Sequence, residues 1–229
     1  KNGIDAKLDV AIGDGKIMLV QKNIDPSLAK QVVDARGLLV VPGLIDMHAH
    51  HFFGVEDDMY LRNSYYANPP DGFTFRNGIT TVVDAGSSGW KSFDRFKAQT
   101  IAHANTRVLA FLNIVGEGMR GGKYEQDTSD MDASAAAACA IRNKEYIVGF
   151  KVAHYNQHNW VPVDRAVQAG NNAGNIPVMI DFGGSGLSLE ELVMQHLRPG
   201  DIYTHMYGGG GRSREAIVDS ATGKLKGFV

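Results

Sequence analysis

The chain has 229 residues, of which 44% are hydrophobic and 21% charged, a composition typical of a globular protein with a sizeable core and not of a disordered chain. Its formal net charge is −2, and Lys and Arg are scattered rather than gathered in a basic stripe, which excludes nucleic acid as an expected partner. A small molecule is therefore the expected ligand, and self-association stays open.

The single cysteine and the chain start bear on the compartment. Cys139 lies in the alanine-rich run 135–140, which is typical of a helix face, so we expect no disulfide within the chain. No run approaches the roughly 18 consecutive apolar residues of a membrane span, so we expect no membrane association. The sequence begins at Lys1 without a Met or a signal-like segment, so we expect a removed leader or a missing start. The compartment is therefore unknown, with the cytoplasm slightly favoured.

The first 42 residues have the pattern of a small β module. Apolar residues alternate over 7–12, Gly13-Asp14-Gly15 forms a turn signal, and a second apolar run covers 17–20. Alternation on both sides of a short glycine turn predicts a β-hairpin.

From residue 43 onward, short β-branched runs alternate with helical stretches, as in a sheet of buried parallel strands. Ser188 and Glu191 have the spacing of a capping box, which marks a helix start. The predicted strands are 44–47, 80–84, 108–114, 147–152, 176–182 and 202–206, and the predicted helices are 92–104, 133–144, 164–173 and 188–197.

Polar residues at the strand ends favour a closed barrel over a doubly wound sheet. The residues at these ends are His48, His50, Lys151, Asp181 and His205. In a (β/α) barrel the carboxyl ends of the strands converge on one mouth, where such enzymes carry their chemistry. The chain after residue 48 is shorter than the roughly 250 residues of a full barrel, so we expect the barrel to be C-terminally incomplete, with six of its eight strands.

The segment His48-Ala49-His50 places two imidazoles on one side of an extended strand, because side chains repeat every second residue. An isolated pair of this kind would most simply be two solvent-facing loop histidines. Here the apolar run 40–47 leads directly into the pair, so a buried strand emerges where the imidazoles lie. Two nitrogen ligands for one metal are the favoured interpretation.

The run 41–50, Val-Pro-Gly-Leu-Ile-Asp-Met-His-Ala-His, resembles the first-strand signature of the amidohydrolase superfamily, which includes dihydroorotases, dihydropyrimidinases and bacterial deacetylases. The resemblance continues through 78–84, 149–151 and 200–205. It implies an α/β fold with a TIM-type (β/α)8 barrel over 43–229. It also implies that residues 1–42 are part of an N-terminal β-sandwich.

The likeness is greatest to the dihydroorotase-like and deacetylase branch, in which a carboxylated lysine bridges two divalent metal ions, usually zinc. By this resemblance His48 and His50 bind one metal, Lys151 is the bridging carbamate, and His205 binds the second. A bridging anion reduces the repulsion between two neighbouring cations. The segment Gly149-Phe150-Lys151 by itself would favour a lysine paired with an acid at the barrel mouth.

The fifth strand departs from the family pattern. The resemblance implies a ligand histidine there, but the chain has Asp181. A carboxylate binds zinc at about the same distance as imidazole, so we expect Asp181 to be a metal ligand. It could instead be an acid or base, or the second metal site could be lost. The family's general-base aspartate, on the eighth strand, has no counterpart in this sequence.

Two further residues are expected to touch substrate. His154 follows Lys151 in a loop, although a solvated position is as well supported. Arg212 follows a glycine run, 208–211, which lacks the Lys-Ser/Thr ending of a phosphate-binding loop and is more typical of a substrate loop.

Together these features predict a metal-dependent hydrolase that cleaves an amide bond with a metal-activated hydroxide. The expected substrates are an N-acyl amino acid, as for a deacetylase, or a cyclic amide or imide, as for a dihydroorotase. One alternative is a non-catalytic scaffold that keeps the barrel. The other is a doubly wound binding protein, although the His-x-His segment stands where such a protein has its glycine-rich phosphate turn.

Overall fold

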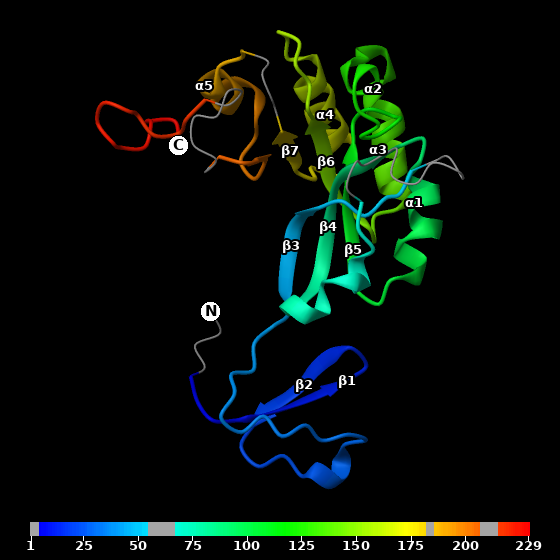
Figure 1. The fold of residues 1–229 in the computed structure, drawn as a ribbon, viewed down its shortest axis with the longest axis vertical. Helices are drawn as coiled ribbons and strands as arrows, with labels where there is room; N and C mark the ends of the chain where they lie inside the picture. The colour runs from blue at the N-terminus through cyan, green and yellow to red at the C-terminus, as the bar shows by residue number, and fades with distance from the viewer. Residues whose placement is uncertain (1–4, 55–66, 182–185, 207–214) are drawn as a thin grey trace. The chain divides into compact units, whose positions relative to one another are not determined.

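The structure is a computed structural model that describes residues 5–54, 67–181, 186–206 and 215–229. The chain divides into two compact units, Lys1–Pro42 and Gly43–Val229. Each unit has a sheet of its own, and Figure 1 shows both sheets as ribbons.

The first unit contains the predicted hairpin. Strands β1 (Asp9–Gly13) and β2 (Lys16–Gln21) pair antiparallel. The turn between them has positive φ at Asp14 and Gly15, 50° and 70°, as the tight hairpin turns that match strand twist require. A short 3₁₀ helix, η1 (Pro26–Leu28), follows. The prediction of a hairpin is therefore confirmed.

The second unit is built on six parallel strands, each hydrogen-bonded to the next along the chain. This unbroken order β3-β4-β5-β6-β7-β8 lacks the reversal that defines a doubly wound sheet, and it fits part of a TIM-like barrel. The strands are β3 (Leu44–Ala49), β4 (Ile79–Gly89), β5 (Arg107–Asn113), β6 (Ile147–Ala153), β7 (Val178–Asp181) and β8 (Ile202–Tyr203).

Helices connect these strands, as the alternating pattern predicts. The longer ones are α1 (Phe93–Gln99), α3 (Ala133–Arg142) and α4 (Val161–Asn172). The shorter ones are η2 (Pro70–Gly72), η3 (Phe75–Asn77), η4 (Ile101–His103), α2 (Lys123–Gln126), η5 (Thr128–Asp130), α5 (Leu189–Glu191) and the π-helical turn η6 (Leu192–His196).

Two predicted helices change character along their length. The predicted helix 92–104 is an α-helix only as far as Gln99 and continues as the 3₁₀ turn η4. In the predicted helix 188–197, Ser188 Oγ accepts a hydrogen bond from the backbone N–H of Glu191, as the capping-box spacing indicates. The next turn is π-helical, which pattern alone does not predict.

The central strands β4 to β7 bury most of both faces, whereas β3 is largely exposed. On one face Val82, Leu112 and Phe150 pack with helix residues such as Phe96 and Ala136, and Figure 1 shows α1, α3 and α4 running beside β4, β5 and β6. On the other face a smaller cluster gathers Val83, Ala85, Phe111 and Met179. Because side chains alternate between the faces of a strand, neighbouring residues such as Val82 and Val83 enter different clusters. This explains the unbroken apolar runs.

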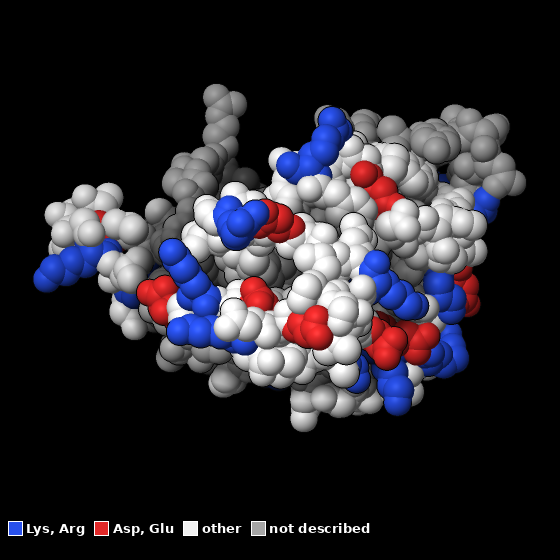
Figure 2. All heavy atoms as spheres, turned by 90° about the horizontal axis from the view of Figure 1, so that it is seen from below, with Lys and Arg blue, Asp and Glu red and all other residues white. Residues whose placement is uncertain are grey.

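Charge is mixed over the surface that Figure 2 shows, where Lys and Arg lie among Asp and Glu instead of forming a continuous stripe. Within the described ranges, no helix is both long and apolar enough to cross a membrane.

Candidate metal site

The carboxyl ends of the parallel strands bring the predicted residues of the second unit to one edge. His48 lies in β3, Lys151 in β6, and Asp181 is the last residue of β7. His205 follows β8 by two residues. One ligand atom each from His48, Asp181 and His205 lies within 4.8 Å of the others, so their donor set fits a metal ion.

Asp181 is the centre of this group. Its Oδ2 atom lies 3.3 Å from His205 Nε2 and 3.5 Å from Lys151 Nζ. The side chains of Lys151 and Asp181 are only 1% and 4% exposed. The structure thus contains the lysine–acid pair that the Gly-Phe-Lys segment by itself favours, and the acid in the pair is Asp181.

The two histidines of the His-x-His segment lie against this group. The rings of His48 and His205 are 4.8 Å apart between centroids, and those of His48 and His50 are 5.6 Å apart. Burial, followed by the positive charge of Lys151, lowers the pKa of His48 to about 4. Burial also lowers the pKa of His50. These lowered pKa values favour the neutral rings, which is the form that binds metal.

A buried carboxylate and a serine hold His50 in place. His50 Nδ1 and Ser87 Oγ are hydrogen-bonded at 3.0 Å. The backbone N–H of Ser87 donates to Asp84 at 2.7 Å, and the other oxygen of Asp84 accepts from the backbone N–H of His51, also at 2.7 Å. Asp84 and Ser87 are fully buried. A partner on Nδ1 leaves Nε2 as the nitrogen of His50 that can face a metal.

The stem of Lys151 occupies space that only a glycine leaves open. A Cβ atom on Gly86 would lie 2.5 Å from Lys151 Cγ and 2.6 Å from its Cβ. Gly86 also has a φ of +86°, a conformation that side chains disfavour. The carbonyl of Gly86 accepts a hydrogen bond from Asn113 Nδ2 at 2.9 Å, so its backbone is held against the lysine.

His154 lies next to Asp181, outside the group of three. Its Nε2 is 3.9 Å from Asp181 Oδ2, and its Nδ1 donates to Glu125 Oε2 at 3.0 Å. The hydrogen bond to Glu125 raises the pKa of His154. Half of the His154 side chain is exposed, whereas that of Glu125 is buried. The other expected substrate residue, Arg212, lies outside the described residues, as does the glycine run before it.

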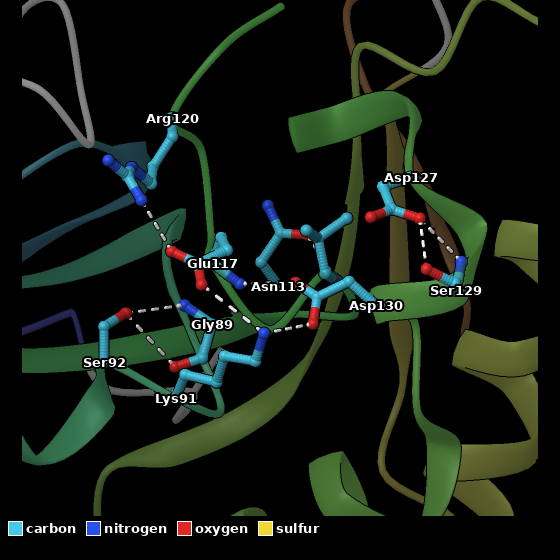
Figure 3. Close-up of polar contacts among 10 residues, drawn as sticks. Gly89, Lys91, Ser92, Asn113, Glu117, Arg120, Asp127, Ser129 and Asp130 are labelled. Atoms are coloured by element: carbon cyan, nitrogen blue, oxygen red, sulfur yellow. Dashed lines mark hydrogen bonds and ion pairs between the residues drawn. The ribbon is translucent and has the colours of Figure 1, made fainter. Parts of the chain in front are cut away.

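The loops that follow β4 and β5 are joined by ion pairs at the same edge of the sheet (Figure 3). Lys91 Nζ lies 2.6 Å from Asp130 Oδ1 and 3.4 Å from Glu117 Oε1, and Arg120 donates to Glu117 at 2.8 Å. The hydrogen bond to Asp130 raises the pKa of Lys91. Burial would raise the pKa of Glu117, but hydrogen bonds from Arg120 and Lys91 lower it overall. The two pairs of Lys91 join the loops, and the Arg120–Glu117 pair lies within the loop after β5.

Three polar residues near the predicted ligands were missed by the sequence reasoning. Asp84 stands at the end of a predicted strand, a position that could have marked it. Ser87 and Glu125 lie in segments without a recognisable pattern, and both contact histidines that are distant in the sequence. Only the folded chain brings them together.

No protein-family model matches the chain. A deacetylase of Agrobacterium fabrum is 31% identical over 228 residues, which cover 96% of this chain and 53% of the relative. A deacetylase of Enterococcus faecalis is 28% identical over 226 residues, which cover 97% and 58%. A dihydroorotase of Streptococcus thermophilus is 46% identical over 50 residues, 22% of this chain and 12% of the relative.

Two solved structures are similar throughout most of the chain. A crystal structure of an adenine deaminase has a TM-score of 0.78 and 28% identity, covering 96% of this chain and 58% of its own. A crystal structure of a dihydroorotase has a TM-score of 0.74 and 28% identity, covering 94% and 56%. The chain spans about half the length of the deacetylases it matches. Sequence and fold agree on the family, and the chain belongs to the amidohydrolase superfamily.

Proposed function

We propose that the protein is a metal-dependent amidohydrolase that hydrolyses a carbon–nitrogen bond in a small molecule. The observation that carries this proposal is the group formed by His48, Asp181 and His205, whose ligand atoms lie within 4.8 Å of one another. The group lies at the carboxyl edge of the parallel sheet, which is where barrel enzymes carry their chemistry.

In this proposal the site holds two divalent ions, which we take to be zinc. His48 and His50 would bind one ion, Lys151 as its carbamate would be shared by both ions, and His205 and Asp181 would bind the other. The burial that lowers the pKa of both His48 and His50 supports the first assignment, because a protonated imidazole has no lone pair to donate. The bound ions would supply an activated water and an electrophile for the scissile carbonyl.

The relatives support an amide of small size as the substrate. Deacetylases match over nearly the whole chain, whereas the dihydroorotases match over about a fifth of it. We therefore place an N-acyl compound such as an N-acyl amino acid ahead of a cyclic amide or imide. Chemically, these substrates share attack at an amide carbonyl and departure of a nitrogen.

A second candidate is a non-catalytic relative that uses the barrel as a scaffold. The observation in its favour is the 3.5 Å pair of Lys151 Nζ and Asp181 Oδ2. A lysine ammonium in this position balances the buried carboxylate without a metal, since buried charges require partners.

Metal content and hydrolysis, measured on the same preparations, separate the two candidates. The hydrolase should contain about two equivalents of zinc, release amine from at least one N-acyl amino acid in a panel, and lose both properties in His48→Ala. A matched control is His103→Ala, because His103 is an exposed histidine on η4. A folded protein without metal, before and after incubation with zinc, would contradict the hydrolase and support the scaffold.

We also propose that residues 1–42 are a domain of their own and form part of a β-sandwich. The hairpin supports this assignment, because its side chains Ile12, Ile17 and Met18 are exposed. A two-stranded hairpin alone is marginally stable, and a second β-layer would cover these apolar side chains.

A further inference from the structure

Asp181 has imidazole neighbours that come from two different loops. His205 Nε2 lies 3.3 Å from its Oδ2 atom, and His154 Nε2 lies 3.9 Å from the same atom. His205 belongs to the group within 4.8 Å that also contains His48. His154 is set apart from that group, and the hydrolase proposal leaves it without a role at the metal.

The 3.9 Å separation is compatible with a shared ion. Zinc lies about 2.0–2.1 Å from a histidine nitrogen and about 2.0–2.2 Å from a carboxylate oxygen, so two such atoms on one tetrahedral ion are about 3.4 Å apart. His154 Nε2 and Asp181 Oδ2 would have to approach each other by about 0.5 Å, which a small rotation of the half-exposed His154 ring supplies.

The backbone holds His154 beside Asp181. The backbone N–H of His154 donates to the carbonyl of Asp181 at 2.9 Å, and its carbonyl accepts from Gln126 Nε2 at 3.0 Å. His154 has a φ of 50° and His205 a φ of 57°. This left-handed conformation is unfavourable for residues other than glycine and is often found at functional sites. Both histidines beside Asp181 therefore carry backbone strain.

Glu125 gives His154 the partner that ligand histidines have. The carboxylate of Glu125 is buried, and it accepts the Nδ1 proton of His154 at 3.0 Å and a backbone N–H from Gly121 at 3.2 Å. A histidine that binds a metal through one nitrogen almost always donates its other N–H to a carboxylate, a carbonyl or water. In the neutral ring, an Nδ1 proton donated to Glu125 leaves the lone pair on Nε2, the nitrogen that lies 3.9 Å from Asp181 Oδ2.

We propose that His154, held by Glu125, is a metal ligand that shares an ion with Asp181. This inference rests on the hydrolase proposal and adds to it a ligand from the loop after β6. The ion beside Asp181 would then have a nitrogen ligand near the end of β7. At that strand end the chain has a carboxylate instead of the histidine that the family resemblance implies. In this role His154 would bind the ion through Nε2, and half of its side chain is exposed.

Cobalt(II) titration of the full chain tests the inference without relying on activity. The informative variant is His154→Asn, because Asn tolerates a left-handed φ and is too short to reach the position of Nε2. We expect its cobalt affinity to fall at least about tenfold and Glu125→Gln to lose about 10–100-fold, the usual range for loss of a partner that orients a ligand. His103→Ala should bind as the wild type does.

Proton NMR of the cobalt form identifies the ligand directly. Each coordinating imidazole contributes an exchangeable, strongly shifted N–H resonance, and one of these should disappear in His154→Asn and persist in His103→Ala. Unchanged affinity and an unchanged set of resonances in folded His154→Asn would overturn the inference while the hydrolase proposal stands. A folded wild-type chain that binds neither cobalt nor zinc would overturn both. Circular dichroism of each variant verifies that the fold is intact.

Discussion

Replacing Gly86 with alanine should destabilise the protein through the stem of Lys151. The added Cβ would lie 2.5 Å from Lys151 Cγ, so the two atoms must separate by about 0.9 Å to reach an ordinary contact of about 3.4 Å. Lys151 cannot easily retreat, because its side chain is 1% exposed and its strand is paired on both sides.

The expected loss has two parts. A left-handed conformation costs an L-residue about 1–2 kcal/mol, and overpacking a buried site costs about 1–3 kcal/mol. Gly86→Ala should therefore lower the free energy of unfolding by about 2–5 kcal/mol. Gly78 is the matched control, since its φ is +71° and an added Cβ would meet nothing within 4 Å. Gly78→Ala should therefore show only the cost of the left-handed conformation, about 1–2 kcal/mol.

Urea denaturation of both variants, followed by circular dichroism, measures the difference. If the two variants lose the same free energy to within about 0.5 kcal/mol, the reasoning about the lysine stem is refuted. A second readout is cobalt affinity, which should fall in Gly86→Ala because the displaced lysine changes the site. Gly78→Ala should leave cobalt affinity unchanged.

The remaining predictions concern a loop and a histidine. Burial would raise the pKa of Asp71, but hydrogen bonds from the backbone and side chains of Asn105 and Thr106 lower it to about 2. A lowered pKa stabilises the fold above the ordinary value of 3.8, so Asp71→Ala should cost about 1–2 kcal/mol at pH 7. This difference in the free energy of unfolding between Asp71→Ala and the wild type should shrink as the pH falls from about 4 to about 2. Urea titrations at several pH values measure it, and a difference that stays constant would contradict the prediction. Ser87→Ala should weaken cobalt binding about 10–100-fold, because it removes the hydrogen-bond partner of His50, and Ser87→Thr should restore the binding. If calorimetry gives Ser87→Ala the same cobalt affinity as the wild type, Ser87 does not position His50.

Local pattern was sufficient for most of the fold. The hairpin, the six parallel strands and the longer helices follow from periodicity, turn residues and β-branched runs, because each of these signals is read within a few neighbouring residues. Strand lengths were less predictable. The predicted strand 202–206 is only Ile202–Tyr203, since pairing with β7 ends after two register positions.

Part of the candidate site could also be predicted from the sequence, and part could not. His48, Asp181 and His205 were predictable as a group, because parallel strands bring their carboxyl ends to one edge. The metal roles of these residues and the carbamate at Lys151 stay predictions. Neither the partner of His50 nor that of His154 could be predicted, because Ser87 and Glu125 follow no periodic pattern and meet their histidines across 37 and 29 residues of sequence.

The sequence by itself determined the βα alternation and the strand ends at which the polar residues stand, since both depend on side-chain order along the chain. Tertiary structure alone decided which polar atoms meet. It placed the buried side chain of Lys151 against Asp181, and it turned His154 toward the same oxygen through a left-handed backbone and a buried glutamate. Such contacts depend on distances of 3 to 4 Å between loops, and residue type and spacing along the chain do not specify those distances.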